Sequence, residues 1–258
     1  MASFQSGGLT LAYDDARPVA VPSGVIVLVH GFATNRTENW RRLGWYAAFE
    51  RRGYRVIAPD LRGHGDSDKP HEPSAYERAA MAEDIVALLD HLDLSRADLM
   101  GYSMGAHLSL AVARGHPRRI TNLILGGIGG RMLAEEARTP DAMSLARAMR
   151  IEDPAVIGDP ILKGFRRFAE SQGEDRLALA ACAEGRGTPW APSDLAAISV
   201  PTLVVAGEAD KIAGDPRVLA DAIPGAKSVS LPACDHFSAI PHALFKAAAF
   251  DFLDGWLD

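Results

Sequence analysis

Short apolar runs recur along the chain, and most of them are continuous rather than alternating with polar residues. Strands that are covered on both faces have this pattern, which is typical of a parallel sheet. We interpret six runs as strands, at residues 25–30, 54–60, 97–103, 121–127, 202–210 and 227–232. A further segment, LTLAYDD at residues 9–15, is expected to form an edge strand.

Between these runs, apolar residues recur every three or four positions, which predicts helices with one buried face. In residues 76–93, for example, one face carries Met81, Ile85, Leu88, Leu89 and Leu92. Further helices are predicted at residues 39–53, 104–117, 216–223 and 241–258. Strands that alternate with helices in this way predict an α/β fold with a mostly parallel, doubly wound sheet.

Residues 131–197 break this alternation. They contain no convincing strand pattern, and the helical patterns in them, interrupted by proline and glycine, cover residues 134–150, 153–173 and 174–185. A block of this length is too large for a simple crossover between two strands. We therefore expect a core domain at residues 1–130 and 198–258 and a helical cap at residues 131–197 that shapes a pocket. The alternative is a helical subdomain that only adds stability.

The composition narrows the class of protein. Apolar residues make up 48% of the 258 residues and charged residues 23%, as in a soluble globular protein. The net charge of −6 argues against binding to nucleic acid or acidic lipid, and no apolar run is long enough to span a membrane. Two cysteines, Cys182 and Cys234, are too few for a disulfide framework, and the first residues lack the pattern of a signal peptide. We expect a cytoplasmic protein that acts on a small molecule; the sequence leaves its oligomeric state open.

The first candidate for chemistry is Ser103, in the sequence GYSMG between a predicted strand and a predicted helix. A sharp turn from strand to helix strains this serine and puts its hydroxyl above the carboxyl edge of the sheet. Gly101 and Gly105 have no side chains to clash where strand and helix approach each other. The amides at the start of the helix can stabilise an oxyanion there. The alternative is a tight turn without chemistry.

A serine hydroxyl is a weak nucleophile and needs a base, usually a histidine that a carboxylate orients. His236 follows the last predicted strand, so its loop lies at the same edge of the sheet as Ser103. The other histidines that we weigh fit less well, and they are His64, His71, His107, His116 and His242.

For the carboxylate we favour Asp210, which ends a buried strand at that same edge. Glu208 is the second choice and Asp215 the third. Asp235 adjoins His236 but is expected to point away from it. The structural alternative for Asp210 is a turn residue or a helix cap.

The order Ser103, Asp210, His236 resembles the order of nucleophile, acid and base in the α/β-hydrolase superfamily. The segment VLVHGF at residues 27–32 is similar to the oxyanion loop of that superfamily, and the resemblance extends over essentially the whole chain. It implies a sheet of about eight strands with a small helical cap. It also implies that the backbone N–H groups of Phe32 and Met104 form the oxyanion hole.

Within the superfamily, the chain is most similar to small capped esterases. A serine nucleophile, in place of aspartate, argues against haloalkane dehalogenases and epoxide hydrolases, and HGFATN at residues 30–35 differs from the HGGP of proline iminopeptidases. The resemblance implies cleavage of a carboxylic ester of a small to medium apolar substrate through an acyl-enzyme on Ser103. It requires no cofactor and no metal, and the dispersed histidines offer no zinc-type cluster.

Another segment, DLRGHGDSD at residues 60–68, also resembles a loop of the superfamily that crosses the sheet edge near the site. For this loop we favour a structural role, in which Asp60 or Arg62 makes local bonds.

Three residues, Tyr102, Trp190 and Phe237, are our candidates for contact with the substrate. The expected cap offers further apolar candidates, each of which could equally belong to its core: Met132, Met143, Met149, Phe165 and Phe168. The same triad could also catalyse carbon–carbon bond hydrolysis, lactone opening, amide hydrolysis, perhydrolysis or cofactor-free oxygen chemistry, because a fold does not choose between reactions. The alternative from another class is a receptor that binds a small apolar molecule without steady turnover.

Overall fold

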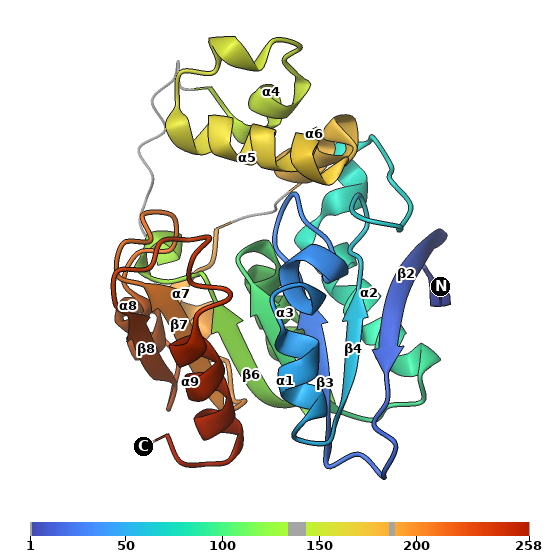
Figure 1. Cartoon of the computed structure of the whole chain (residues 1–258), viewed down its shortest axis with the longest axis vertical. Helices are drawn as coiled ribbons and strands as arrows, with labels where there is room; N and C mark the ends of the chain where they lie inside the picture. The colour runs from blue at the N-terminus through green and yellow to red at the C-terminus, as the bar shows by residue number, and fades with distance from the viewer. Residues whose placement is uncertain (1, 134–142, 186–188, 258) are drawn as a thin grey trace.

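A computed structural model describes residues 2–133, 143–185 and 189–257, and an eight-stranded sheet forms its centre (Figure 1). The strands are β1 (Ala2–Ser6), β2 (Leu9–Ala16), β3 (Gly24–Val29), β4 (Tyr54–Pro59), β5 (Ala97–Tyr102), β6 (Ile120–Gly126), β7 (Thr202–Gly207) and β8 (Lys227–Leu231). Their order across the sheet is β1-β2-β4-β3-β5-β6-β7-β8. The pairs β1–β2 and β2–β4 are antiparallel and the other pairs are parallel. The predicted α/β fold with a mostly parallel sheet of about eight strands is confirmed.

The amino-terminal edge of the sheet differs from the prediction. LTLAYDD lies in β2, but β1 pairs with it on the outer side, so β1 is the edge strand. Gly7 and Gly8 connect the two strands with φ angles of 54° and 80°, which side chains disfavour and a tight hairpin turn requires. β1 was missed because a run of five residues with few apolar side chains gives a weak pattern.

Helices cover both faces of the sheet (Figure 1). One face carries α1 (Trp45–Glu50) and α9 (Ala243–Leu253). The other face carries α2 (Arg78–His91), α3 (Met104–Gly115) and α8 (Pro216–Asp221). Two short 3₁₀ helices, η2 (Pro73–Tyr76) and η3 (Pro117–Arg119), lie in connecting loops.

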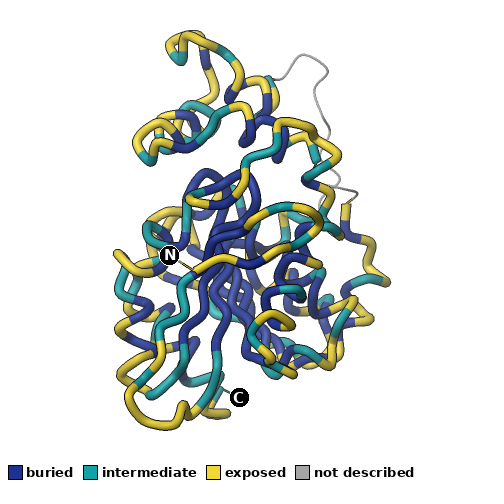
Figure 2. Tube along the Cα trace, turned by 90° about the vertical axis from the view of Figure 1, so that its right-hand side faces the viewer, coloured by how far each residue is buried: buried dark blue, intermediate teal, exposed yellow. Residues whose placement is uncertain are grey.

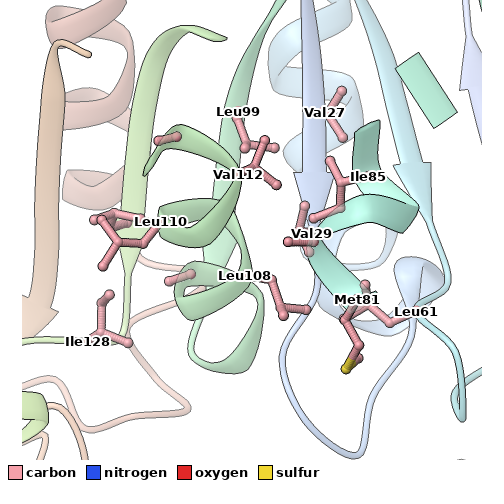
Figure 3. Close-up of a cluster of buried hydrophobic side chains, with 14 of the residues drawn as sticks. Val27, Val29, Leu61, Met81, Ile85, Leu99, Leu108, Leu110, Val112 and Ile128 are labelled. Carbon is pink, nitrogen blue, oxygen red and sulfur yellow. The ribbon is translucent and has the colours of Figure 1, made fainter. Parts of the chain in front are cut away.

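The largest apolar cluster lies between the sheet and helices α2 and α3 (Figure 3). Val29 and Leu99 of the sheet face Ile85 of α2 and Val112 of α3, and all four side chains are buried. Removing a side chain of this kind from water contributes about 1.5–3 kcal/mol. Figure 2 shows buried strands in the middle of the sheet, and β3 to β7 are buried along most of their length. This packing holds α3, and with it the Ser103 turn at its start, against the sheet.

Two predicted helices are shorter than expected. The segment 39–53 is divided between the end of a π-helix, η1 (Thr37–Arg41), and α1, because Gly44 between them has a left-handed conformation with a φ of 76°. The last helix, α9, ends at Leu253, and Gly255 just beyond it has a φ of 74°. In both cases apolar residues continue past a glycine, but the helix does not continue through it.

The described part of the chain between β6 and β7 is helical, as predicted. It contains η4 (Gly130–Leu133), α4 (Leu145–Arg150), η5 (Pro154–Val156), α5 (Pro160–Gln172), α6 (Arg176–Glu184) and α7 (Pro192–Ala196). Figure 1 shows α4, α5 and α6 beyond one end of the strands. Residues 134–142 of the helix predicted at 134–150, and residues 186–188 of the expected cap, lie outside the described residues. The function of this segment as a cap, and its boundaries, stay predictions.

Candidate active site

Ser103 lies at the turn between β5 and α3, with a φ of 53° and a ψ of −114°. Positive φ is unfavourable for a residue with a side chain, so the turn holds Ser103 in a strained conformation, as predicted. Gly101 and Gly105 allow α3 to approach β5 and β3 closely. A Cβ on Gly101 would lie 2.2 Å from the carbonyl oxygen of Gly105, and a Cβ on Gly105 would lie 2.1 Å from that of Val29. Any side chain at these two positions would therefore push α3 away from the sheet.

The loop after β8 brings His236 to Ser103. The Nε2 atom of His236 lies 3.0 Å from Oγ of Ser103, and its Nδ1 atom lies 2.8 Å from Oδ2 of Asp210. In this arrangement Nδ1–H donates to the carboxylate and the serine hydroxyl donates to Nε2. The side chains of His236 and Asp210 are 6% and 0% exposed, so this hydrogen bond lies where water is largely excluded.

Asp210 follows the end of β7, and both of its carboxylate oxygens are engaged. Oδ1 accepts hydrogen bonds from the N–H groups of Ile212 and Ala213, each at 2.9 Å. These two bonds hold the carboxylate in place and leave Oδ2 for the imidazole of His236. Such a carboxylate determines which ring nitrogen carries the proton.

The rival carboxylates serve other purposes. Asp215 caps α8 by accepting a hydrogen bond from the N–H of Arg217, and the side chain of Glu208 is exposed. Asp235 accepts hydrogen bonds from the hydroxyl and the N–H of Ser238 and from the N–H of Phe237, and these bonds lower the pKa of its carboxyl group. The structure therefore brings Asp210, and none of these three, to His236.

The loop after β3 passes beside Ser103 and carries the predicted oxyanion residue Phe32. A Cβ on Gly31 would lie 3.6 Å from Cβ of Ser103, so the loop is in contact with the turn. Met104 is the first residue of α3, a position at which helix amides have no partner within the helix. The two predicted donor residues are thus on the two segments that flank the hydroxyl.

Sequence reasoning missed Asn39, which belongs to η1. Asn39 is 3% exposed, and its Oδ1 atom accepts a hydrogen bond from the N–H of Gly31 at 3.1 Å. Asn39 also lines the cavity at Ser103. The apolar pattern does not distinguish this buried asparagine from one on the surface. Its hydrogen bond to Gly31 forms only when the chain folds, because the two residues are eight positions apart.

A second missed residue is Glu174, between α5 and α6. Its carboxylate accepts hydrogen bonds from Nδ2 of Asn35, at 3.1 Å, and from the N–H of Gly65, at 3.0 Å. Glu174 is 8% exposed, and burial raises the pKa of its carboxyl group. These bonds attach the helical segment to the loops that follow β3 and β4.

A cavity of about 240 Å³ opens onto Ser103 and His236. Apolar side chains form most of its wall, and they are Phe32, Leu43, Phe165, Phe168, Phe237 and Ile240. The rings of Phe165 and Phe168, both on α5, lie 5.8 Å and 6.0 Å from the ring of Phe237. The cavity is therefore shaped jointly by the sheet's carboxyl edge and by α5.

The three predicted substrate contacts have different outcomes. Phe237 lines the cavity and is 45% exposed. Tyr102 also lines it, but its hydroxyl donates to the carbonyl oxygen of His236 at 2.6 Å, and burial raises its pKa well above the usual value. Trp190 is not among the residues that line this cavity: its indole N–H donates to Nδ1 of His107 and its ring lies under the guanidinium of Arg78. The prediction that Trp190 contacts the substrate is therefore not supported, because packing on α3 turns its ring elsewhere.

The loop of residues 60–68 makes the local bonds expected of it. Asp60 is buried and accepts hydrogen bonds from the backbone and side chain of Arg36, and burial raises its pKa. Arg62 forms a two-bond ion pair with Asp84 of α2, at 2.7 Å and 2.6 Å. These contacts hold the loop against the core.

The described residues form neither a cluster of metal ligands nor a membrane-spanning helix. Among residues 2–133, 143–185 and 189–257, no group of three or more His, Cys, Asp or Glu side chains is arranged to hold a metal ion. Within the same ranges, none of the helices has the length and apolar character needed to cross a membrane.

Comparison with known proteins agrees with the α/β fold. A family model described as alpha/beta hydrolase fold matches residues 24–156. 2-Hydroxymuconate semialdehyde hydrolase from Pseudomonas sp. (strain CF600) is 29% identical over 248 residues, which are 88% of this chain and 86% of that protein. The enol-lactonase from Burkholderia xenovorans LB400 has a similar structure, with a TM-score of 0.79 and 26% identity over 98% of this chain and 100% of that one. For a thermophilic esterase from Thermogutta terrifontis the TM-score is 0.73 and the identity 26%, over 99% and 97% of the two chains.

Some curated relatives are longer than this chain, which spans 44% of the length of one of them and 33% of another. The family model nevertheless covers just over half of the chain, from β3 through the Ser103 turn and into the helical segment. The chain therefore belongs to the alpha/beta hydrolase fold family.

Proposed function

We propose that this protein is a serine hydrolase that cleaves a carboxylic ester of a small to medium, apolar substrate. One observation carries the proposal: the imidazole of His236 contacts both the hydroxyl of Ser103 and the carboxylate of Asp210, at the wall of an apolar cavity. A hydroxyl with a base in contact, and a base oriented by a carboxylate, is the arrangement that activates a serine.

In the first half of the reaction, Nε2 of His236 takes the proton of Ser103 as Oγ attacks the ester carbonyl. The carbonyl oxygen becomes negative and is stabilised by the N–H groups of Phe32 and Met104; one such donor is typically worth ~10²–10³ in rate. The carbon–oxygen bond of the ester then breaks, and the alcohol leaves with the proton from His236. The acyl group remains on Ser103.

In the second half, water gives a proton to Nε2 of His236 and attacks the acyl carbonyl. The bond to Oγ breaks, Ser103 regains its proton, and the carboxylic acid leaves. Asp210 accepts the Nδ1–H of His236 throughout and stabilises the imidazolium in both halves. Water is the only co-reactant that the two steps consume.

We also propose that residues 131–197 act as a cap over this site, with residues 1–130 and 198–258 as the core. Phe165 and Phe168 of α5 support this division, because they line the cavity together with Ser103. The cavity of about 240 Å³ is below the usual range for ligand pockets, about 300–1,000 Å³. Its size and lining favour short apolar acyl groups, with Phe237 in contact with them.

Carbon–carbon bond hydrolysis is the second candidate, because the relative that aligns along 88% of the chain is named a 2-hydroxymuconate semialdehyde hydrolase. The similar structure of an enol-lactonase makes lactone opening a third. All three reactions could use Ser103 and His236, so the geometry of these two residues does not distinguish between the reactions.

The test begins with a fluorophosphonate probe and peptide mapping by mass spectrometry. We expect the label on Ser103, with no label in Ser103→Ala and unchanged labelling in Ser171→Ala, a matched variant at an exposed serine of α5. Steady-state assays with p-nitrophenyl acetate and butyrate should then show many turnovers for the wild type and a loss of at least ~10³-fold for Ser103→Ala.

Two outcomes would contradict ester hydrolysis through an acyl-enzyme. Substantial activity in Ser103→Ala would mean that His236 acts as a base without a serine nucleophile. Tight binding of a small apolar molecule with at most one turnover would favour a receptor. A panel that adds a diketone and a lactone separates the two other hydrolytic reactions from ester cleavage.

A further inference from the structure

The charges at the cavity wall restrict what can bind there. Among the described residues that line the cavity, the only ionisable side chains besides Tyr102 are those of Glu38 and His236, and none is a lysine or arginine. His236 is already engaged with Asp210 and Ser103. Among the described lining residues, Glu38 therefore supplies the one carboxylate at the cavity wall.

Glu38 has a counter-charge, but on its solvent side. Its carboxylate oxygens lie 2.8 Å and 3.0 Å from Nη1 of Arg42, one turn further along the chain. The side chain of Arg42 is 70% exposed and does not line the cavity, whereas that of Glu38 is 21% exposed. Water screens the guanidinium more strongly than the carboxylate, so a negative potential remains inside the cavity.

A substrate that carries a carboxylate would meet two penalties there. The phenylalanine rings would strip water from its charge, and the described lining offers no lysine or arginine to pair with it, which is costly for any ion. Glu38 would then add repulsion between like charges, in an environment of low dielectric constant. An uncharged substrate of the same size meets neither penalty.

We propose that this site selects uncharged esters and rejects those whose acyl group ends in a carboxylate, with Glu38 as a specificity-determining residue. The inference rests on the proposed function. It extends that function by excluding half-esters of dicarboxylic acids, which the shape and size of the cavity would otherwise admit.

The test compares two esters of nearly equal size, p-nitrophenyl pentanoate and mono-p-nitrophenyl glutarate, whose acyl chains end in a methyl and a carboxylate group. For the wild type, kcat/KM should favour the pentanoate by about thirtyfold or more. Glu38→Gln should reduce this ratio about three- to tenfold. Arg42→Gln, the matched variant, removes the screening cation and should raise the ratio about two- to threefold, with kcat/KM for the pentanoate unchanged.

A ratio near one for the wild type, or a ratio that Glu38→Gln does not lower, would overturn the inference. Titration calorimetry of both esters with Ser103→Ala measures the preference for the uncharged ester without turnover. The preference is then the ratio of the two Kd values. The two hypotheses can thus fail separately. Turnover of the pentanoate that depends on Ser103 supports the proposed function at any ratio, and a Kd preference lowered by Glu38→Gln supports the selectivity even if esters are not cleaved.

Discussion

Oδ1 of Asn39 accepts the hydrogen bond of the Gly31 N–H, and this bond joins η1 to the loop that presents Phe32 beside Ser103. The contact is buried, so removal of the amide leaves the Gly31 N–H without its partner, at a cost of about 1–3 kcal/mol. We expect the loop to relieve that cost by moving, which would misplace the Phe32 amide.

Asn39→Ala should therefore lower kcat for p-nitrophenyl butyrate about ten- to a hundredfold, with a smaller change in KM. Asn122→Ala is the control, because it removes a side-chain hydrogen bond to Asp98 in the sheet, away from the cavity. If both variants lose stability but only KM changes in Asn39→Ala, the residue binds substrate and does not position the oxyanion loop.

Asp210→Asn should abolish most of the activity without unfolding the protein. The amide preserves the shape of the carboxylate but cannot stabilise an imidazolium, and it favours the wrong tautomer of His236, a change that typically costs about 10⁴-fold in kcat. Glu208→Gln and Asp215→Asn remove the rival carboxylates and should stay close to wild type. The measurement is kcat for all three variants, and a larger loss in either control would show that Asp210 is not the acid.

Tyr102→Phe tests whether this residue positions the base or binds the substrate. The hydroxyl of Tyr102 is committed to the carbonyl oxygen of His236, so its removal should loosen the loop after β8. We expect a loss of about 1 kcal/mol in unfolding free energy and a severalfold decrease in kcat, with KM nearly constant. Urea unfolding and steady-state kinetics check both. An increase in KM at constant kcat would instead indicate a direct contact with the substrate.

His64 should make the protein less stable in mild acid. Its ring is buried against His30 and Phe32, and burial lowers its pKa from 6.5 to about 4. Between these values the unfolded chain binds a proton that the folded chain does not. The stabilisation is thus complete above pH 6.5 and is lost as pH falls toward 4.

From pH 7.5 to pH 5.0, this single group should lower the unfolding free energy by about 2 kcal/mol. His64→Gln should remove that part of the pH dependence, whatever its effect on stability at pH 7.5. Urea unfolding of both proteins at the two pH values gives the comparison. An equal pH dependence for wild type and variant would show that His64 is protonated to the same extent in both states.

Most of the architecture was predictable because it depends on local patterns. Largely continuous apolar runs identified β3 to β7, since strands covered on both faces contain few polar residues. The edge strand β8, with the sequence KSVSL, alternates polar and apolar residues and is partly exposed. The glycines around Ser103 identified the strained turn, because no other residue permits the approach of α3 to β5 that the structure shows. β1, which is short and weakly apolar, offered no such pattern.

The sequence by itself determined the order of strands and helices and the edge of the sheet at which Ser103, Asp210 and His236 would be found. Only the tertiary structure decided which side chains surround them. It placed Phe165 and Phe168 at the cavity, turned Trp190 onto His107, and buried Asn39 against the loop that carries Gly31 and Phe32. Periodicity specifies that one face of a helix is buried, whereas the partner of that face depends on how distant segments pack together.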